Sequence, residues 1–237
     1  SPIFIAAAAP NQTDPAPAAF DPRKTVPVEA LKDDLKILWD ILEEGHGGFD
    51  RYTPASALRK SFEAAANGLT GPLTEIDFYT RLLPLVAEIK DGHTLLSLSS
   101  AATAYLQGRP VFLPFGLRFL GDRVYMFRNL SSETGIRDGT ELLSIDGTPI
   151  GDIVATLLPL VPSDAGIRTS KLRRLENATV FGRLLALKFG ERESRRIRFR
   201  PVGGGAVQEI TVPGVTAAET VRLLRERYPA ATERRPT

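Results

Sequence analysis

The sequence predicts an α+β protein, in which an N-terminal helical bundle precedes a small antiparallel sheet with two helices. Up to about residue 92, apolar residues recur at three- and four-residue steps, the period of an amphipathic helix. From about residue 108, the apolar runs are short and are separated by glycine turns, as in antiparallel strands. The predicted divisions are a disordered leader (1–26), a helical cap (27–92), a connector (93–107), the sheet domain (108–213) and a helical linker (214–237).

Three helices are expected in the first part. The first covers 26–44 and ends at the glycines that flank His46, a residue expected to cap this helix end, where a cation is favoured. The second begins at Thr53, whose hydroxyl can cap free N–H groups, and the proline after it suits a first helical turn. The third begins at Thr74 and contains Pro84.

The second part is expected to alternate strands and helices. The predicted strands cover 94–98, 111–120, 124–128 and 140–145, followed by a hairpin of 197–202 and 207–212 around three glycines. The predicted helices cover 99–107, 150–160, 171–189 and 216–228.

The composition excludes several kinds of site. Cysteine is absent, which removes disulfides, thiol nucleophiles and thiolate metal ligands. The only histidines are His46 and His93, so a histidine-rich metal site is excluded, and neither a metal nor a cofactor is expected. No apolar run is long enough to span a bilayer. Residues 1–10 resemble the tail of a secretory signal peptide, or else an Ala/Pro leader, so an exported, periplasmic or extracellular protein is expected.

Charge is distributed unevenly along the chain. From residue 166 onward there are 16 Lys+Arg and 7 Asp+Glu, a net +9, whereas the first 165 residues hold 14 and 21, a net −7. A basic half can indicate nucleic acid or anionic lipid as a partner. The arginines here lack the interleaved aromatic residues of a base-stacking platform. A solvated surface or a protein-docking face is therefore favoured, and no nucleic-acid partner is expected.

One segment, residues 135–150, has a recognisable pattern. It reads Gly-Ile-Arg-Asp-Gly-Thr-Glu-Leu-Leu-Ser-Ile-Asp-Gly-Thr-Pro-Ile. This resembles the signature of bacterial PDZ domains, in which a glycine turn, a buried strand and an Asp-Gly turn precede a helix. Thr140 replaces the aspartate that is usual there. The alternative is an unrelated strand between two glycine turns.

A second PDZ-like feature lies upstream, at Phe115, Gly116, Leu117, Arg118 and Phe119. It resembles the carboxylate-binding loop of PDZ domains and the strand that follows. A glycine between apolar residues lets backbone N–H groups point at a terminal carboxylate. The strand edge can then accept a peptide as an added strand. These five residues are the predicted peptide-binding site.

The helical part suggests a family. A helix ending in Leu-Glu-Glu-Gly-His46 resembles the start of many secreted serine peptidases of the C-terminal-processing (tail-specific, tricorn-core) family, although Gly47 stands where they often have proline. That family carries an Asp-x-His step after the helices, and Asp91-Gly-His93 matches it. The order of these features covers about residues 27–228.

The resemblance implies a serine endopeptidase whose PDZ-like domain captures peptide or protein C-termini. It also implies that the serine lies in a catalytic domain beyond this chain, so the chain alone is expected to be inactive. In tricorn-like members the residue equivalent to His93 is the general base; in lysine-dyad members it is not, and a histidine bound to backbone remains the alternative. Ser56 and Lys60 are four residues apart, but no glycine-rich oxyanion loop precedes them, so a surface helix is favoured. The alternative function is a non-enzymatic PDZ-like peptide-binding or scaffold protein.

Overall fold

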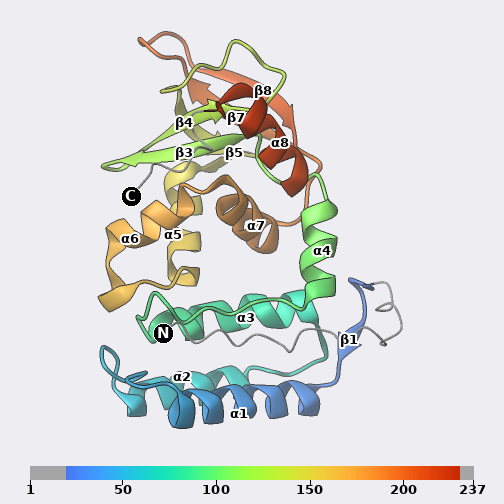
Figure 1. Cartoon of the computed structure of the whole chain (residues 1–237), viewed down its shortest axis with the longest axis vertical. Helices are drawn as coiled ribbons and strands as arrows, with labels where there is room; N and C mark the ends of the chain where they lie inside the picture. The colour runs from blue at the N-terminus through green and yellow to red at the C-terminus, as the bar shows by residue number, and fades with distance from the viewer. Residues whose placement is uncertain (1–19, 230–237) are drawn as a thin grey trace. The chain divides into compact units, whose positions relative to one another are not determined.

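The computed structural model describes residues 20–229 and confirms the α+β class (Figure 1). The chain divides into two compact units, and the division falls inside helix α4 (Ser100–Gly108). The first unit holds the chain up to Tyr105 and a later segment, Pro159–Arg168; the second holds Leu106–Leu158 and the chain from Thr169 onward. Compact units need not coincide with domains, so the domain limits given above stay predictions. No helix in residues 20–229 is long and apolar enough to cross a membrane.

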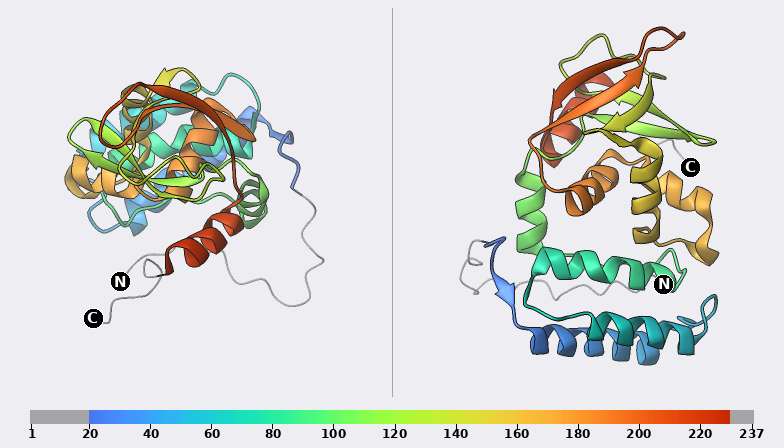
Figure 2. Two further views of the ribbon diagram at one scale, coloured as in Figure 1. Left: turned by 90° about the horizontal axis from the view of Figure 1, so that it is seen from above. Right: turned by 180° about the vertical axis from the view of Figure 1, so that it is seen from behind.

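The first unit is built around three helices, which Figure 2 shows from behind. They are α1 (Val28–Gly45), α2 (Ala55–Asn67) and α3 (Glu75–Glu88). Their apolar stripes meet at Trp39, whose ring packs edge-on against Phe49 and Phe62. Full burial of such side chains stabilises the folded state by about 1.5–3 kcal/mol each. The apolar positions that repeat with the helical period therefore form the core of this unit.

Helix ends in this unit depart from expectation at one place. Thr74 caps α3 as predicted, by accepting the N–H of Asp77 at 3.1 Å. Thr53 does not cap α2, and its hydroxyl instead donates to the carbonyl of Glu88 at 2.7 Å. Thr53 is buried, and a buried hydroxyl needs a partner, which here is the end of a different helix.

Residues 25–26 lie inside the predicted disordered leader but form strand β1 (Thr25–Val26), which pairs with β2 (Leu73–Thr74). Residues 20–24 of that leader are described but form no helix or strand, and residues 1–19 lie outside the described residues. The segment predicted as a strand at 94–98 forms none in the described structure. Leu96 packs against the helical core instead, and its carbonyl accepts the hydroxyl of Tyr79 at 3.3 Å.

The second unit is an antiparallel sheet with strand order β3-β4-β5-β7-β8, and the short β6 also pairs with β5. The strands are β3 (Phe115–Leu120), β4 (Arg123–Asn129), β5 (Glu141–Ile145), β6 (Thr148–Pro149), β7 (Ser194–Arg200) and β8 (Gln208–Pro213). The hairpin of β7 and β8 around the three glycines is confirmed. Strand β3 begins later than predicted, and Phe112 forms an isolated bridge with Val215 instead.

Four helices belong to this unit: α5 (Ile150–Leu157), α6 (Arg168–Leu175), α7 (Ala178–Phe189) and α8 (Ala217–Arg227). Helices α5 and α7 lie on the same face of the sheet (Figure 1). The approach of α7 to the chain before β3 is close, because a Cβ built on Gly182 would lie 2.9 Å from the Phe112 ring. A larger residue at position 182 would push the helix away.

The predicted helix over 171–189 is broken into α6 and α7. The break lies at Asn177, whose side-chain oxygen accepts the N–H groups of Thr179 and Val180 at 3.0 and 3.1 Å. Asparagine in this role starts a new helix, since it satisfies N–H groups that have no partner within the helix. The predicted helix at 150–160 ends as a short 3-10 turn, Leu158–Leu160.

Candidate functional site

His93 lies on a turn that follows α3. Lys90 has a left-handed backbone, with φ of 61°, which ends the helical path and turns the chain toward Asp91. The Asp91 carboxylate then folds back over the turn. Its Oδ1 accepts the backbone N–H of His93 at 2.8 Å, and its Oδ2 accepts the Thr94 hydroxyl at 3.0 Å. Aspartate often stabilises turns by accepting the N–H two residues ahead, so the sequence Asp-Gly-His-Thr fixes this backbone locally.

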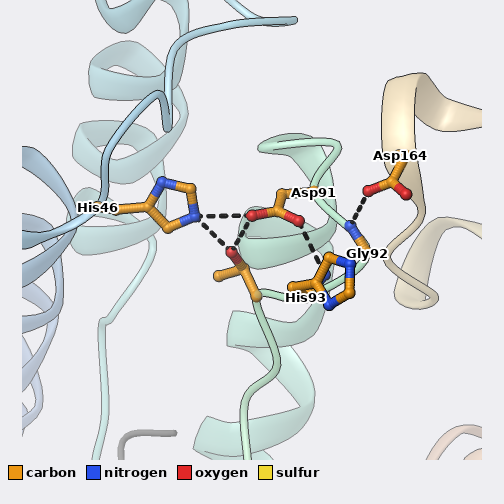
Figure 3. Close-up of polar contacts among 6 residues, drawn as sticks. His46, Asp91, Gly92, His93 and Asp164 are labelled. Carbon is orange, nitrogen blue, oxygen red and sulfur yellow. Dashed lines mark hydrogen bonds and ion pairs between the residues drawn. The ribbon is translucent and has the colours of Figure 1, made fainter. Parts of the chain in front are cut away.

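His46 reinforces the turn from the end of α1 (Figure 3). Its Nε2 lies 2.9 Å from Asp91 Oδ2 and 2.6 Å from Thr94 Oγ1. Because the Thr94 hydroxyl donates to Asp91, it can only accept from His46, so the proton of the ring belongs on Nε2. His46 Nδ1 is buried without a hydrogen-bond partner in the described part of the chain. His46 is the C-cap residue of α1, as predicted, and its backbone N–H donates to the carbonyl of Leu42 at 3.2 Å, while its side chain holds the Asp91 turn.

Asp91 stays ionised in this setting. Burial alone would raise the pKa of its carboxyl group. The N–H of His93, the Thr94 hydroxyl and the His46 ring outweigh burial and hold the pKa of Asp91 below its ordinary value. A carboxylate with three donors is a firm anchor for the backbone of the turn.

A second carboxylate holds the preceding residue. Asp164 Oδ1 accepts the backbone N–H of Gly92 at 2.7 Å (Figure 3). The adjacent N–H of Ala165 donates to the carbonyl of Lys90 at 2.9 Å. Asp164 stands 72 residues further along the chain, and no sequence motif pointed to it.

The His93 side chain itself is exposed, although its backbone is fixed. A neutral imidazole can take a proton from a hydroxyl group as a general base. Figure 3 shows the ring turned away from the Asp91 carboxylate that holds its backbone. No group of three or more His, Cys, Asp or Glu side chains that could bind a metal occurs within 20–229. The arrangement therefore offers an accessible base on a rigid turn.

The predicted peptide-binding strand, β3, lies at the end of the sheet and has one edge without a neighbouring strand in the described structure. Phe115 and Leu117 are core residues, each 1% exposed. Gly116 does not have a left-handed backbone. Glycine is needed here for lack of space, because a Cβ at position 116 would lie 3.1 Å from the carbonyl oxygen of Phe127 on β4.

The open edge of β3 is covered by Glu176, a residue that sequence analysis did not identify. Glu176 Oε1 lies 3.4 Å from the N–H of Phe119, and Oε2 lies 2.9 Å from Arg118 Nη1. Arg173 adds a third contact at 2.8 Å, and the Glu176 side chain is only 12% exposed. Arg118 is therefore engaged in an ion pair with this glutamate. A charged side chain over a free strand edge is a common way to prevent unwanted strand addition.

The remaining candidate pair, Ser56 and Lys60, lies on exposed positions of α2. Because both side chains are exposed, they lack the burial expected of an activated serine–lysine pair. The surface-helix interpretation of these residues is retained.

Comparison with known proteins places the fold. The sequence matches no known family profile. A protein of Chlamydia trachomatis serovar D is 26% identical over 161 residues, which cover 62% of this chain and 26% of that protein.

Among solved structures, mature CPAF, a chlamydial serine protease, superposes with a TM-score of 0.50 at 19% identity, over 89% of this chain and 38% of that chain. Mature CPAF complexed with lactacystin gives a TM-score of 0.54 at 20% identity, over 89% and 39%. The chain thus shares the fold of part of CPAF and spans well under half the length of the proteins it resembles.

Proposed function

We propose that this chain is the N-terminal and PDZ-like, substrate-binding part of an exported bacterial serine endopeptidase of the C-terminal-processing type. In this proposal the nucleophilic serine belongs to a further domain of the whole protein. The likeness of the fold to CPAF supports a protease, and the His93 turn is the single observation that carries the catalytic assignment.

His93 would act as the general base. Its neutral imidazole would take the proton of the serine hydroxyl as the oxygen attacks the peptide carbonyl, and the imidazolium would then give that proton to the leaving amine. Such a base must be held in place before reaction. The two carboxylates on the N–H groups of Gly92 and His93 supply this placement, while the ring stays accessible.

Peptide capture is the second part of the proposal, with the edge of β3 as the receiving strand. The N–H of Phe119 faces Glu176 across this edge. An incoming peptide would have to displace that carboxylate and take over its place beside Arg118. A peptide's own C-terminal carboxylate has the charge needed to compete for the same guanidinium. Binding should therefore be weak, because the edge is already satisfied.

The test uses the complete gene product and an active-site-directed fluorophosphonate. We expect labelling of a serine outside residues 1–237, which is lost in the His93→Ala variant because the serine is no longer activated. Ser56→Ala serves as the matched control and should label normally. Full labelling of His93→Ala would contradict the role of His93, and labelling of Ser56 itself would overturn the assignment of the nucleophile to another domain. A gene product that no serine probe labels would favour the non-enzymatic peptide-binding protein.

A further inference from the structure

The segment between the His93 turn and α4, residues 94–99, pairs with no strand in the described structure, yet it is stretched out. It runs back along α3 (Figure 1), and at its far end the N–H of Ser99 donates to Glu75 Oε1, at the start of that helix, at 2.8 Å. Helix α3 has 14 residues and is therefore about 21 Å long. Residues 94–99 span about 20–22 Å when fully extended. The segment therefore needs an extended backbone to return along the helix.

Exposure alternates along this segment. Leu95 and Ser97 are exposed, with Leu95 at 58%, whereas the residues on either side of each are half-buried. Of these, Leu96 packs against the helical core and holds the segment in place. A period of two is typical of an extended chain with one side against a core. His93, two positions before Leu95, is exposed as well, so the proposed base continues the exposed row.

The backbone groups of the segment differ in their partners. The carbonyl of Leu96 faces α3, because it accepts the hydroxyl of Tyr79 at 3.3 Å. In an extended chain the N–H and C=O of one residue point to one edge, and those of the next residue point to the other edge. The groups of Leu95 and Ser97 therefore point away from Tyr79. Neither residue forms a hydrogen bond with any other part of residues 20–229.

This free edge differs from the edge of β3. At β3 the Glu176 carboxylate covers the N–H of Phe119. Residues 94–99 contain only threonine, leucine and serine, so the segment itself has neither a charge nor a proline to protect its edge. Proteins commonly use such residues to prevent strand addition, and an exposed extended segment that lacks them is a template for pairing. The segment is thus prepared to accept a strand, and β3 is not.

We propose that residues 94–98 receive an extended stretch of polypeptide, which pairs with the N–H and C=O groups of Leu95 and Ser97. The position of the segment identifies the occupant. It follows His93 directly, so a chain paired with it runs past the proposed base; the identification of that chain as substrate rests on the proposed function. The residue beside Leu95 should be apolar, because side chains that face each other across a strand pair stabilise it by contact. No free C-terminus is needed.

The experiment is amide NMR of the intact, ¹⁵N-labelled chain, titrated with a hexapeptide of alternating threonine and valine that is blocked at both ends. We expect saturable shifts at the amides of Leu95 and Ser97, and exchange of these two N–H groups with water should slow at least about fivefold. Affinity should be millimolar, since a short peptide must be ordered on binding. The same peptide N-methylated at its two central residues lacks an N–H on each edge and should not slow the exchange.

Two variants at one position test the role of the backbone. Ser97→Pro removes an N–H of the free edge, while its fixed φ suits an extended chain. Ser97→Ala is the matched comparison, because it removes the same hydroxyl and keeps the N–H. We expect Ser97→Pro to bind the hexapeptide about fivefold more weakly than Ser97→Ala. In the complete gene product, the two variants should differ more in KM for peptide hydrolysis than in kcat.

Slowed exchange at Leu95 and Ser97 that depends on the peptide's N–H groups would support the site. Equal effects of the plain and N-methylated peptides, equal binding by the two Ser97 variants, or unchanged exchange would each overturn it. Slow exchange that appears without peptide and increases with protein concentration would assign the edge to a second copy of this chain, and would overturn the peptide assignment. Binding of the hexapeptide by a protein that no serine probe labels would support the receiving segment and contradict only the peptidase, so the two proposals fail separately.

Discussion

The His93 turn and the β3 edge are the two places where the sequence predicted function, and the structure treats them in opposite ways. At the turn, carboxylates hold the backbone and leave the His93 ring exposed. At the edge, a carboxylate occupies the backbone group that a ligand would use. The same chemical group, an aspartate or glutamate that accepts a backbone N–H, thus prepares one site and closes the other. The two sites differ because the functional group at the turn is the side chain of His93, whereas at the β3 edge it is the backbone N–H of Phe119, which the carboxylate itself occupies.

The largest effect is expected from removing the anchor of the turn. Asp91→Ala deletes a carboxylate that accepts from His93, Thr94 and His46. A hydrogen bond to a charged group contributes about 1.5–3 kcal/mol, but the three donors share one carboxylate that is 27% exposed, so the free energy of unfolding should fall by about 2–3 kcal/mol in total. Urea denaturation monitored by the fluorescence of Trp39 measures this. Asp50→Ala, at an exposed position, is the control and should change stability by less than about 0.5 kcal/mol.

The same anchor should make stability depend on pH in the acid range. Folding lowers the pKa of Asp91. The contribution of this carboxylate to stability is therefore complete above its pKa in the unfolded chain, about 4. It is lost as the pH falls through its pKa in the folded protein. Stability should therefore decline below about pH 4, and Asp91→Asn should show a shallower decline. Parallel pH profiles for the two proteins would mean that Asp91 is not a stabilising carboxylate.

At the β3 edge, Gly116 should tolerate little added volume. A Cβ would lie 3.1 Å from the Phe127 carbonyl, and the two branches of valine would crowd it further. We expect Gly116→Val to cost about 2 kcal/mol and Gly116→Ala to cost less, measured by thermal or urea unfolding. Equal costs for the two would indicate that backbone conformation, rather than space, sets the need for glycine.

A smaller change in stability, but an informative one, is expected at Glu176. Glu176→Gln keeps the shape and removes the charge that pairs with Arg118 and Arg173. Stability should fall by about 1 kcal/mol, and affinity for a peptide with a free apolar C-terminus should rise about fivefold, because the competing carboxylate is gone. Glu209→Gln, in an exposed pair with Arg196, is the control. Tighter binding of the amide form as well would show that the edge does not read a carboxylate.

Local signals in the sequence predicted most of the fold. The apolar stripe of α1, the Thr74 cap and the glycine-linked β7–β8 hairpin depend on neighbours a few residues away, and each was found. The break at Asn177 was missed because the flanking residues continue a helical pattern and no glycine or proline marks the end. The strand expected at 94–98 was wrong because tertiary contacts at Leu96 outweighed its β propensity.

The candidate sites divide in the same way. Asp91 and His93 are near in sequence, and their motif was recognised. Glu176 lies 57 residues from Phe119, and Asp164 lies 72 from Gly92, so only the folded chain brings them together. Long-range partners of this kind carry no local pattern, and they are the residues that decide whether a predicted site is prepared or covered.

If His93 supplies the base of a serine peptidase, added imidazole should rescue a variant that lacks this side chain. The complete gene product is assayed for peptide hydrolysis as the unmodified protein and as His93→Ala, with and without added imidazole. The exposed position of the His93 ring leaves room for a free imidazole to enter the vacated place. We predict that His93→Ala lowers kcat/KM by about a hundredfold to ten-thousandfold and that imidazole restores part of it. Undiminished hydrolysis by His93→Ala would contradict the account.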